Sequence, residues 1–174
     1  VRFGEDVYLD GVNLTPQQFL DKLTESTELP KTSQINEYRW AEQFEKLTAN
    51  GDQVIAITIS SKLSGTFNSA KAAAKKFPGQ VFVVDSLTAA TGERVLCDYG
   101  LRLIAEGKTA EQVATELDTI KHKVQVIAIV DTLKYLRKGG RISTLTAFAG
   151  ELLSIKPVIS VIGGEVKMAG KAMG

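Results

Sequence analysis

The chain has 174 residues, a formal net charge of +1, and 44% hydrophobic against 24% charged residues. At roughly 100 to 200 residues per domain, this length predicts one domain, or one domain and part of another. The near-neutral charge leaves no electrostatic surplus for holding a polyanion, which argues against nucleic acid as a partner. No apolar stretch approaches the ~20 residues that span a bilayer, so we expect no transmembrane segment and at most peripheral membrane contact.

The single copies of Cys97 and His122 restrict the chemistry further. One cysteine cannot form an internal disulfide, so a reducing, cytoplasmic location is predicted. One histidine cannot supply a multi-histidine zinc site, and we expect no metal and no cofactor. Cys97 is predicted to be a small core residue of a helix, and His122 a solvated residue at a helix end.

Local signals in chain order predict alternating helices and strands. Thr15-Pro16-Gln17-Gln18 and Thr109-Ala110-Glu111-Gln112 each combine an N-cap Thr with a Gln three residues later, which predicts two helix starts. Trp40, Phe44 and Leu47 recur with helical spacing. The remaining expected elements are strands over 54–59, 81–84 and 124–130, helices over 69–76, 91–106 and 133–137, and a hairpin of 155–162 with 165–168.

This alternation predicts an α/β fold with a mostly parallel sheet flanked by helices on both faces. We assign residues 1–150 to this N-terminal domain and residues 151–174 to the beginning of a second, incomplete α/β domain. The sequence begins at Val1 without Met and stops directly after an expected strand, so we expect a piece of a longer protein.

Polar residues follow each expected strand, where ligands bind in open parallel sheets. Ser64-Gly65-Thr66 stands where a helix begins, so its hydroxyl groups and free backbone N–H groups converge on a place that favours an anion. The alternative is that Ser64 or Thr66 only caps that helix. Asp85 and Asp131 could bind Mg²⁺ or, more ordinarily, cap turns.

Catalytic signatures are mostly missing. A serine-dependent hydrolase would use Ser64 as nucleophile, but a Ser-His-Asp triad would require His122, and no G-x-S-x-G elbow occurs.

A basic cluster around a Gly-Gly turn is either a solvated face or a docking patch for an acidic partner; it consists of Lys134, Arg137, Lys138 and Arg141.

Several sequence segments, taken in their order and spacing, form a pattern that covers nearly the whole chain. The segments are Asp10-Gly11-Val12-Asn13-Leu14-Thr15-Pro16, Leu29-Pro30-Lys31-Thr32-Ser33-Gln34, Ile59-Ser60-Ser61-Lys62-Leu63-Ser64-Gly65-Thr66-Phe67-Asn68-Ser69-Ala70, Val83-Val84-Asp85-Ser86, Val130 to Ser143 with its Gly139-Gly140-Arg141 turn, and Ile155-Lys156-Pro157. Together they resemble the DegV family of bacterial fatty-acid-binding proteins, and Lys31, where the family often has Thr, is a peripheral departure.

The resemblance implies a carrier and not an enzyme. Such proteins bury one long-chain fatty acid between two domains and present its carboxylate to a separate fatty acid kinase, which makes acyl phosphate for phospholipid synthesis. Family members are longer at both ends, so a first strand and most of a C-terminal lid domain are expected to be missing here. By motif position, Thr32, Ser64, Gly65 and Thr66 would bind the carboxylate, and Arg137, Lys138 and Arg141 would face the kinase. The alternatives are the Ser64 hydrolase and a protein-interaction module.

Overall fold

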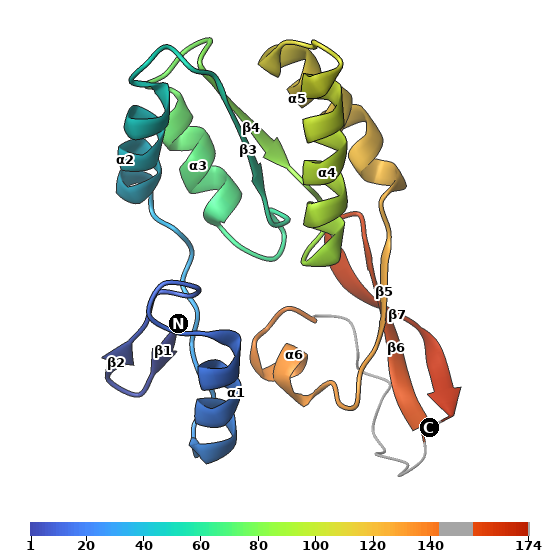
Figure 1. The fold of residues 1–174 in the computed structure, drawn as a ribbon. Coiled ribbons are helices and arrows are strands. Elements are labelled where there is room, and N and C mark those ends of the chain that lie inside the picture. The colour runs from blue at the N-terminus through green and yellow to red at the C-terminus, as the bar shows by residue number, and fades with distance from the viewer. Residues whose placement is uncertain (143–154, 174) are drawn as a thin grey trace. The chain divides into compact units, whose positions relative to one another are not determined.

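The computed structural model describes residues 1–142 and 155–173, and the chain divides into two compact units, Val1–Gln34 and Ile35–Gly174 (Figure 1). The boundary that we predict between residues 1–150 and 151–174 falls on residues outside the described ranges. That boundary therefore stays a prediction.

The first unit consists of a two-stranded antiparallel ribbon and one helix. The ribbon pairs β1 (Arg2–Phe3) with β2 (Asp6–Val7), and the helix is α1 (Pro16–Glu25). Thr15 Oγ1 accepts a hydrogen bond from the Gln18 amide at 3.2 Å, and Gln18 Oε1 accepts one from the Thr15 amide at 2.8 Å. The predicted capping box is therefore confirmed, and it fixes where α1 begins.

The core of the first unit is small and aromatic. Leu14 is its fully buried side chain, and the Phe3 ring packs edge-on against Tyr8 and Phe19. The Lys22 ammonium lies 5.0 Å from the centre of the Tyr8 ring. A hydrogen bond with the Tyr8 hydroxyl is the main cause that raises the pKa of Lys22. The ammonium therefore stays charged over this ring.

The second unit contains the predicted alternation of strands and helices. Its elements are α2 (Glu37–Thr48), β3 (Val54–Thr58), α3 (Thr66–Ala74), β4 (Val81–Asp85), α4 (Thr91–Ala105), α5 (Ala110–Ile120), a 3-10 turn (Lys121–Lys123), β5 (Val126–Ile129), α6 (Lys134–Lys138), β6 (Ile155–Ile162) and β7 (Glu165–Met173). The capping box at Thr109 is confirmed, with Thr109 Oγ1 accepting from the Gln112 amide. Helix α3 begins three residues earlier than we predict, because its N-cap is Gly65.

Strands β3 and β4 form a parallel pair in register from Val54 opposite Val81 to Thr58 opposite Asp85. Helices α2 and α3 cover one face of this pair, and α4 and α5 cover the other (Figure 1). The α/β class with helices on both faces is therefore confirmed. Because side chains alternate along a strand, each strand supplies both faces with apolar groups.

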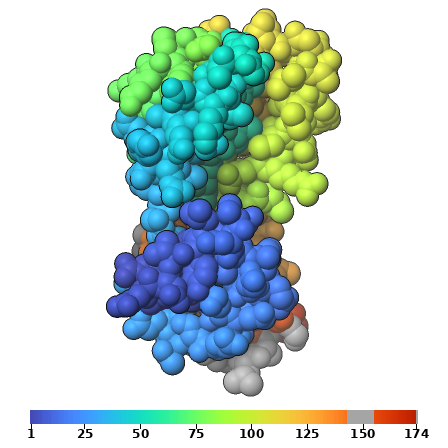
Figure 2. Space-filling model, turned by 60° about the vertical axis from the view of Figure 1, so that its left-hand side comes forward, coloured from blue at the N-terminus to red at the C-terminus, as the bar shows by residue number. Residues whose placement is uncertain are grey.

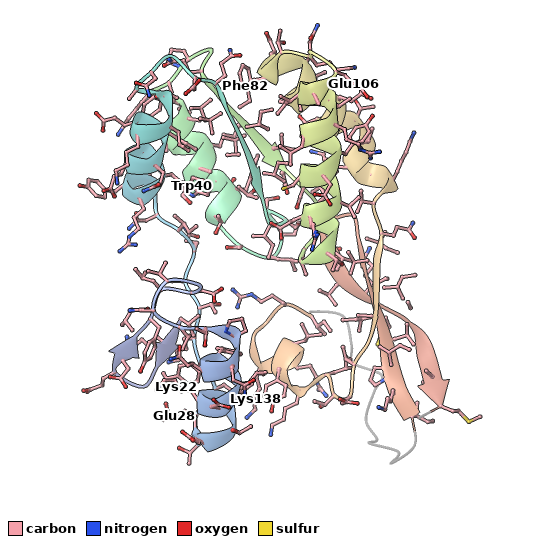
Figure 3. The ribbon with its side chains drawn as sticks, in the orientation of Figure 1. Lys22, Glu28, Trp40, Phe82, Glu106 and Lys138 are labelled. Carbon is pink, nitrogen blue, oxygen red and sulfur yellow. The ribbon has the colours of Figure 1, made fainter. Side chains whose placement is uncertain are left out.

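The core under α2 and α3 surrounds Phe44, which is 1% exposed, and is completed by small side chains that let α3 approach the sheet. Trp40 projects from α2 on the side of α3 and lies 5.3 Å from Phe44, ring centre to ring centre (Figure 3). Leu47, which we expected on the same face, is exposed, and Thr48 is buried instead. Thr48 fits there because its hydroxyl donates to the Phe44 carbonyl.

The core under α4 and α5 is built from leucine and valine, among them Val84, Leu96, Val113 and Leu117. The outer faces of α2, α4 and α5 form part of the surface seen in Figure 2. Our placement of Cys97 in this core is wrong, because Cys97 is exposed. The buried stripe of α4 runs through Leu96, and the next residue is turned about 100° around the helix axis.

We expected β5 to be a third strand of the parallel sheet, and this prediction is wrong. Strand β5 pairs antiparallel with β6, and β6 pairs with β7 through the predicted hairpin turn Gly163-Gly164. Ile127 and Ile129 of β5 are consequently exposed on one side of a separate three-stranded sheet. The eight-residue β6 offers a long edge, and local sequence cannot show which edge a strand joins.

Within residues 1–142 and 155–173, no helix combines the length and the apolar character that crossing a bilayer requires.

Candidate anion-binding site

The loop between β3 and α3, residues 59–65 and hereafter the serine loop, carries the predicted anion-binding residues Ser64 and Gly65, and Thr66 begins α3 directly after it. Ser64 Oγ lies 2.9 Å from Thr66 Oγ1 and accepts a hydrogen bond from the Thr66 amide at 3.2 Å. Thr66 is buried and Ser64 is half-buried. The N-cap, Gly65, makes no side-chain cap bond, but Ser64 satisfies an amide of the first turn. The capping interpretation therefore accounts for part of what Ser64 does.

The hydroxyl pair can still donate outward. Two hydroxyl groups in contact share one proton between their oxygens, so the other proton is free for a ligand acceptor. The Phe67 and Asn68 amides belong to the first turn of α3, where a helix provides no carbonyl partner. Because the Thr66 amide is engaged by Ser64, these next amides, more than that of Thr66, are the backbone donors for an anion at the helix start.

Ser60 holds the serine loop in place and was not among our predicted residues. Its side chain is fully buried, its amide donates to the Thr88 carbonyl at 2.9 Å, and its carbonyl accepts from the Leu63 and Ser64 amides. Its hydroxyl donates to the Gly164 carbonyl at 2.8 Å and accepts from the Lys62 amide at 3.2 Å. Two of these partners are 28 and 104 residues away, so the sequence near Ser60 contains no signal of this role.

The polar residues after β4 brace the same end of the sheet. The Asp85 carboxylate accepts from the amides of Ser61 and Leu87, both at 3.1 Å. Ser86 and Thr88 bond to each other within their own loop. Asp85 thus takes the turn-capping role that we set beside Mg²⁺ binding. Among the described residues, no three His, Cys, Asp or Glu side chains are grouped as a metal site would need.

The polar residues after β5 have a different setting. Asp131 is exposed and forms an ion pair with Lys156, with 2.9 Å between Oδ1 and Nζ. The hydrogen bond from Lys156 and its charge hold the pKa of Asp131 below its usual range. Thr132 Oγ1 accepts from the Lys134 amide just before α6. Asp131 and Thr132 therefore make an ion pair and a local hydrogen bond, in contrast to Asp85, which bonds to the serine loop.

The basic cluster lies on α6 and the turn that follows. Arg137 and Lys138 are exposed, and Lys138 projects from the end of α6 (Figure 3). Arg141 is also exposed, but its Nε donates to the Leu63 carbonyl at 3.3 Å and its Nη1 donates to the Gly139 carbonyl. Arg141 therefore contacts the serine loop one residue before Ser64, in addition to the partner-facing role that we predict.

Thr32 belongs to the first unit, whereas Ser64, Gly65 and Thr66 belong to the second. Thr32 is exposed and follows Lys31, whose backbone exchanges two hydrogen bonds with Arg2. This bridge to β1 holds the segment that carries Thr32 against the ribbon of the first unit.

The described contacts of Ser64 bear on the hydrolase alternative. Within the described ranges, the partners of its hydroxyl are the Thr66 hydroxyl and the Thr66 amide, neither of which can act as a general base. His122 is an exposed residue of the 3-10 turn that follows α5. That position agrees with our expectation of a solvated helix end.

These observations define an α/β domain with a hydroxyl-lined loop at a helix start. The chain belongs to the DegV family: the family model described as "Uncharacterised protein, DegV family" matches residues 1–174. A DegV domain-containing protein from Deinococcus radiodurans is 34% identical over 174 residues, which are 100% of this chain and 62% of the relative.

Two solved structures are similar to this chain over most of its length. One is described as fatty acid binding of a DegV family protein from Thermus thermophilus; its TM-score is 0.87 at 36% identity, with 99% of this chain and 61% of that chain covered. The other is described as a fatty acid (stearic acid)-binding protein from Eubacterium ventriosum, with a TM-score of 0.85 at 29% identity, covering 98% and 60%. This chain therefore spans about three fifths of the proteins that it resembles.

Proposed function

We propose that this chain is part of a carrier that binds one long-chain fatty acid and presents the carboxylate to a separate fatty acid kinase. The observation that carries the proposal is the similarity to the fatty-acid-binding protein of Thermus thermophilus, at a TM-score of 0.87 and 36% identity. The stearic-acid-binding relative supports the same ligand class. The hydroxyl pair at the start of α3 supports the same assignment from chemistry.

The acyl tail supplies most of the affinity in this proposal. Burial of a sixteen-carbon chain at ~0.8 kcal/mol per CH₂ contributes about 11 kcal/mol before the ordering costs of binding. The carboxylate then needs hydrogen-bond donors, because a bare charge beside apolar surface is costly. Thr32, Ser64 and the amides at the start of α3 are the donors that we assign to it, with Gly65 giving the ligand access to the backbone.

Hydroxyl and amide donors suit a carboxylate that must later react. They stabilise its charge without a full cation, so one oxygen can attack the γ-phosphorus of ATP on the kinase and release ADP. The product is an acyl phosphate. We assign Arg137, Lys138 and Arg141 to the surface that meets the kinase, because all three charges are exposed. Arg141 also bonds to the Leu63 carbonyl, which brings this surface to the serine loop.

The carboxylate assignment is tested with the double variant Thr32→Ala and Ser64→Ala in the full natural protein. We expect it to fold and to bind palmitate at least about tenfold more weakly, because a hydrogen bond to a charged group contributes about 1.5–3 kcal/mol. Radiolabelled palmitate binding measures the effect, and native mass spectrometry of protein purified from cells reports the ligand that it carries.

The matched control is Ser33→Ala with Ser61→Ala, which removes one hydroxyl from each of the same two loops. It should bind palmitate as the wild type does. Equal palmitate binding by the Thr32/Ser64 variant would refute the site, and a wild type that neither carries nor binds fatty acid would refute the function. Turnover of an activated ester by the protein alone would favour the hydrolase alternative.

The kinase surface is tested with Arg137→Glu and Lys138→Glu. Charge reversal on an exposed docking patch slows association with an acidic partner, so we expect acyl phosphate formation to fall about tenfold or more at low salt. Palmitate binding should be unchanged. Equal rates of acyl phosphate formation for wild type and variant would remove these residues from the partner surface.

A further inference from the structure

We propose that the turn of the β6–β7 hairpin positions the serine loop for carboxylate binding, with Ser60 as the positioning residue that connects them. The inference rests on the proposed function and deepens it, because it assigns a role in ligand recognition to Ser60, Gly164 and Glu165. None of these residues is assigned to the ligand itself.

Two contacts join the hairpin turn to the serine loop, and together we call them the hairpin contact. Ser60 Oγ donates to the Gly164 carbonyl at 2.8 Å in a fully buried setting. Lys62 and Glu165 form an exposed ion pair at 3.6 Å. Both contacts start from residues that lie two to four positions before Ser64. The hairpin therefore contacts the part of the serine loop that directly precedes Ser64.

The turn is shaped to come this close. Gly164 is buried with φ +86°, and a Cβ at this position would lie 2.5 Å from Ser60 Oγ. An L side chain would therefore be strained by the backbone and would collide with the hydroxyl. The absence of a side chain at Gly164 allows the buried hydrogen bond.

Ser60 transmits this contact to Ser64 through the backbone. Its carbonyl accepts from the Leu63 amide at 2.9 Å and from the Ser64 amide at 3.1 Å, and its hydroxyl accepts from the Lys62 amide. The same hydroxyl thus bonds the hairpin and the loop. If the bond to Gly164 is lost, the Ser60 side chain no longer has a fixed direction, and the position of the Ser64 hydroxyl loosens with it.

The test compares Ser60→Ala with Ser86→Ala in the full natural protein. Ser86 is an equally buried serine of the neighbouring loop, but its hydroxyl bonds only locally with Thr88. Each variant is titrated with palmitate and with 1-hexadecanol, an uncharged analogue with the same tail. A loop that positions carboxylate donors should affect the acid and spare the alcohol.

We expect Ser60→Ala to weaken palmitate binding about tenfold, the size of one charge-assisted hydrogen bond, with hexadecanol binding unchanged. Ser86→Ala should leave both unchanged. A folded Ser60→Ala variant that binds palmitate as the wild type does, or that loses both ligands equally, overturns the inference while leaving the proposed function intact. A wild type that binds neither ligand refutes the proposed function and this inference with it.

Glu165→Gln keeps the inference testable if Ser60→Ala does not fold, because Glu165 is exposed. Removal of a negative charge by itself would favour an anion, whereas loss of the ion pair with Lys62 loosens the hairpin contact. We expect palmitate to bind about twofold more weakly, since exposed ion pairs contribute little. Unchanged or tighter palmitate binding by this variant overturns the inference.

Discussion

The carboxyl ends of β3 and β4 differ from that of β5, although all three look alike in the sequence. Each strand is apolar, and Asp, Ser or Thr stands at its end or within two residues after it. After β3 and β4, these residues are buried and bonded to each other's loops, as Asp85 is to the Ser61 amide. After β5, Asp131 is exposed and paired with Lys156. In this chain, the polar residues form a hydrogen-bonded pair of loops where the parallel strands β3 and β4 end side by side, and an exposed ion pair after β5.

The largest expected effect concerns the side chains that pack against each sheet. Leu96→Ala removes a fully buried side chain that packs under β3 and β4, and should lower the free energy of unfolding by about 3 kcal/mol. Ile127→Ala on the exposed side of β5 should change it by less than about 0.5 kcal/mol. Urea unfolding followed by circular dichroism measures both. Similar losses for the two variants would contradict the difference between the sheets.

The second test compares the two strand-end aspartates. Asp85→Ala leaves the half-buried amides of Ser61 and Leu87 without their acceptor, and should cost about 2 kcal/mol of unfolding free energy. Asp131→Asn removes only an exposed ion pair and should have a much smaller effect. The same urea titrations apply. A larger loss for Asp131→Asn would reverse the comparison.

The small Asp131 effect has a defined pH dependence. The pKa of Asp131 is lowered by Lys156, so the pair stabilises the folded protein above the ordinary Asp range and loses this contribution as the pH falls through the lowered value. The difference between wild type and Asp131→Asn should therefore be present at neutral pH and vanish in acid. A difference that grows in acid would contradict this sign.

Local signals allowed much of the fold to be predicted. The capping boxes at Thr15 and Thr109 predicted two helix starts correctly, because each motif bonds within four residues. The start of α3 was misplaced, since Gly65 makes no side-chain cap bond that a motif could reveal. The pairing of β5 with β6 was also missed, because at least 29 residues separate the paired positions.

The same limit applies to the candidate site: residues of a local motif could be predicted, and residues that act through distant contacts could not. Ser64-Gly65-Thr66 could be recognised as a polar segment at a helix start, and the structure brings the two hydroxyls within 2.9 Å. Ser60 could not be recognised, because its partners Thr88 and Gly164 are distant in sequence. Thr32 was assigned by resemblance to the family, and it lies in the other unit of the chain.

The exposed thiol of Cys97 gives this chain a ready-made attachment point for a spectroscopic reporter. It is the sole cysteine of the sequence, so a maleimide dye or spin label reacts at one place on α4 without prior mutagenesis. Partial desolvation, followed by the charges of Glu93 and Asp98, raises the pKa of the thiol, so labelling proceeds faster in mildly alkaline buffer. In this chain, the label can report on its surroundings by fluorescence or electron paramagnetic resonance without any substitution.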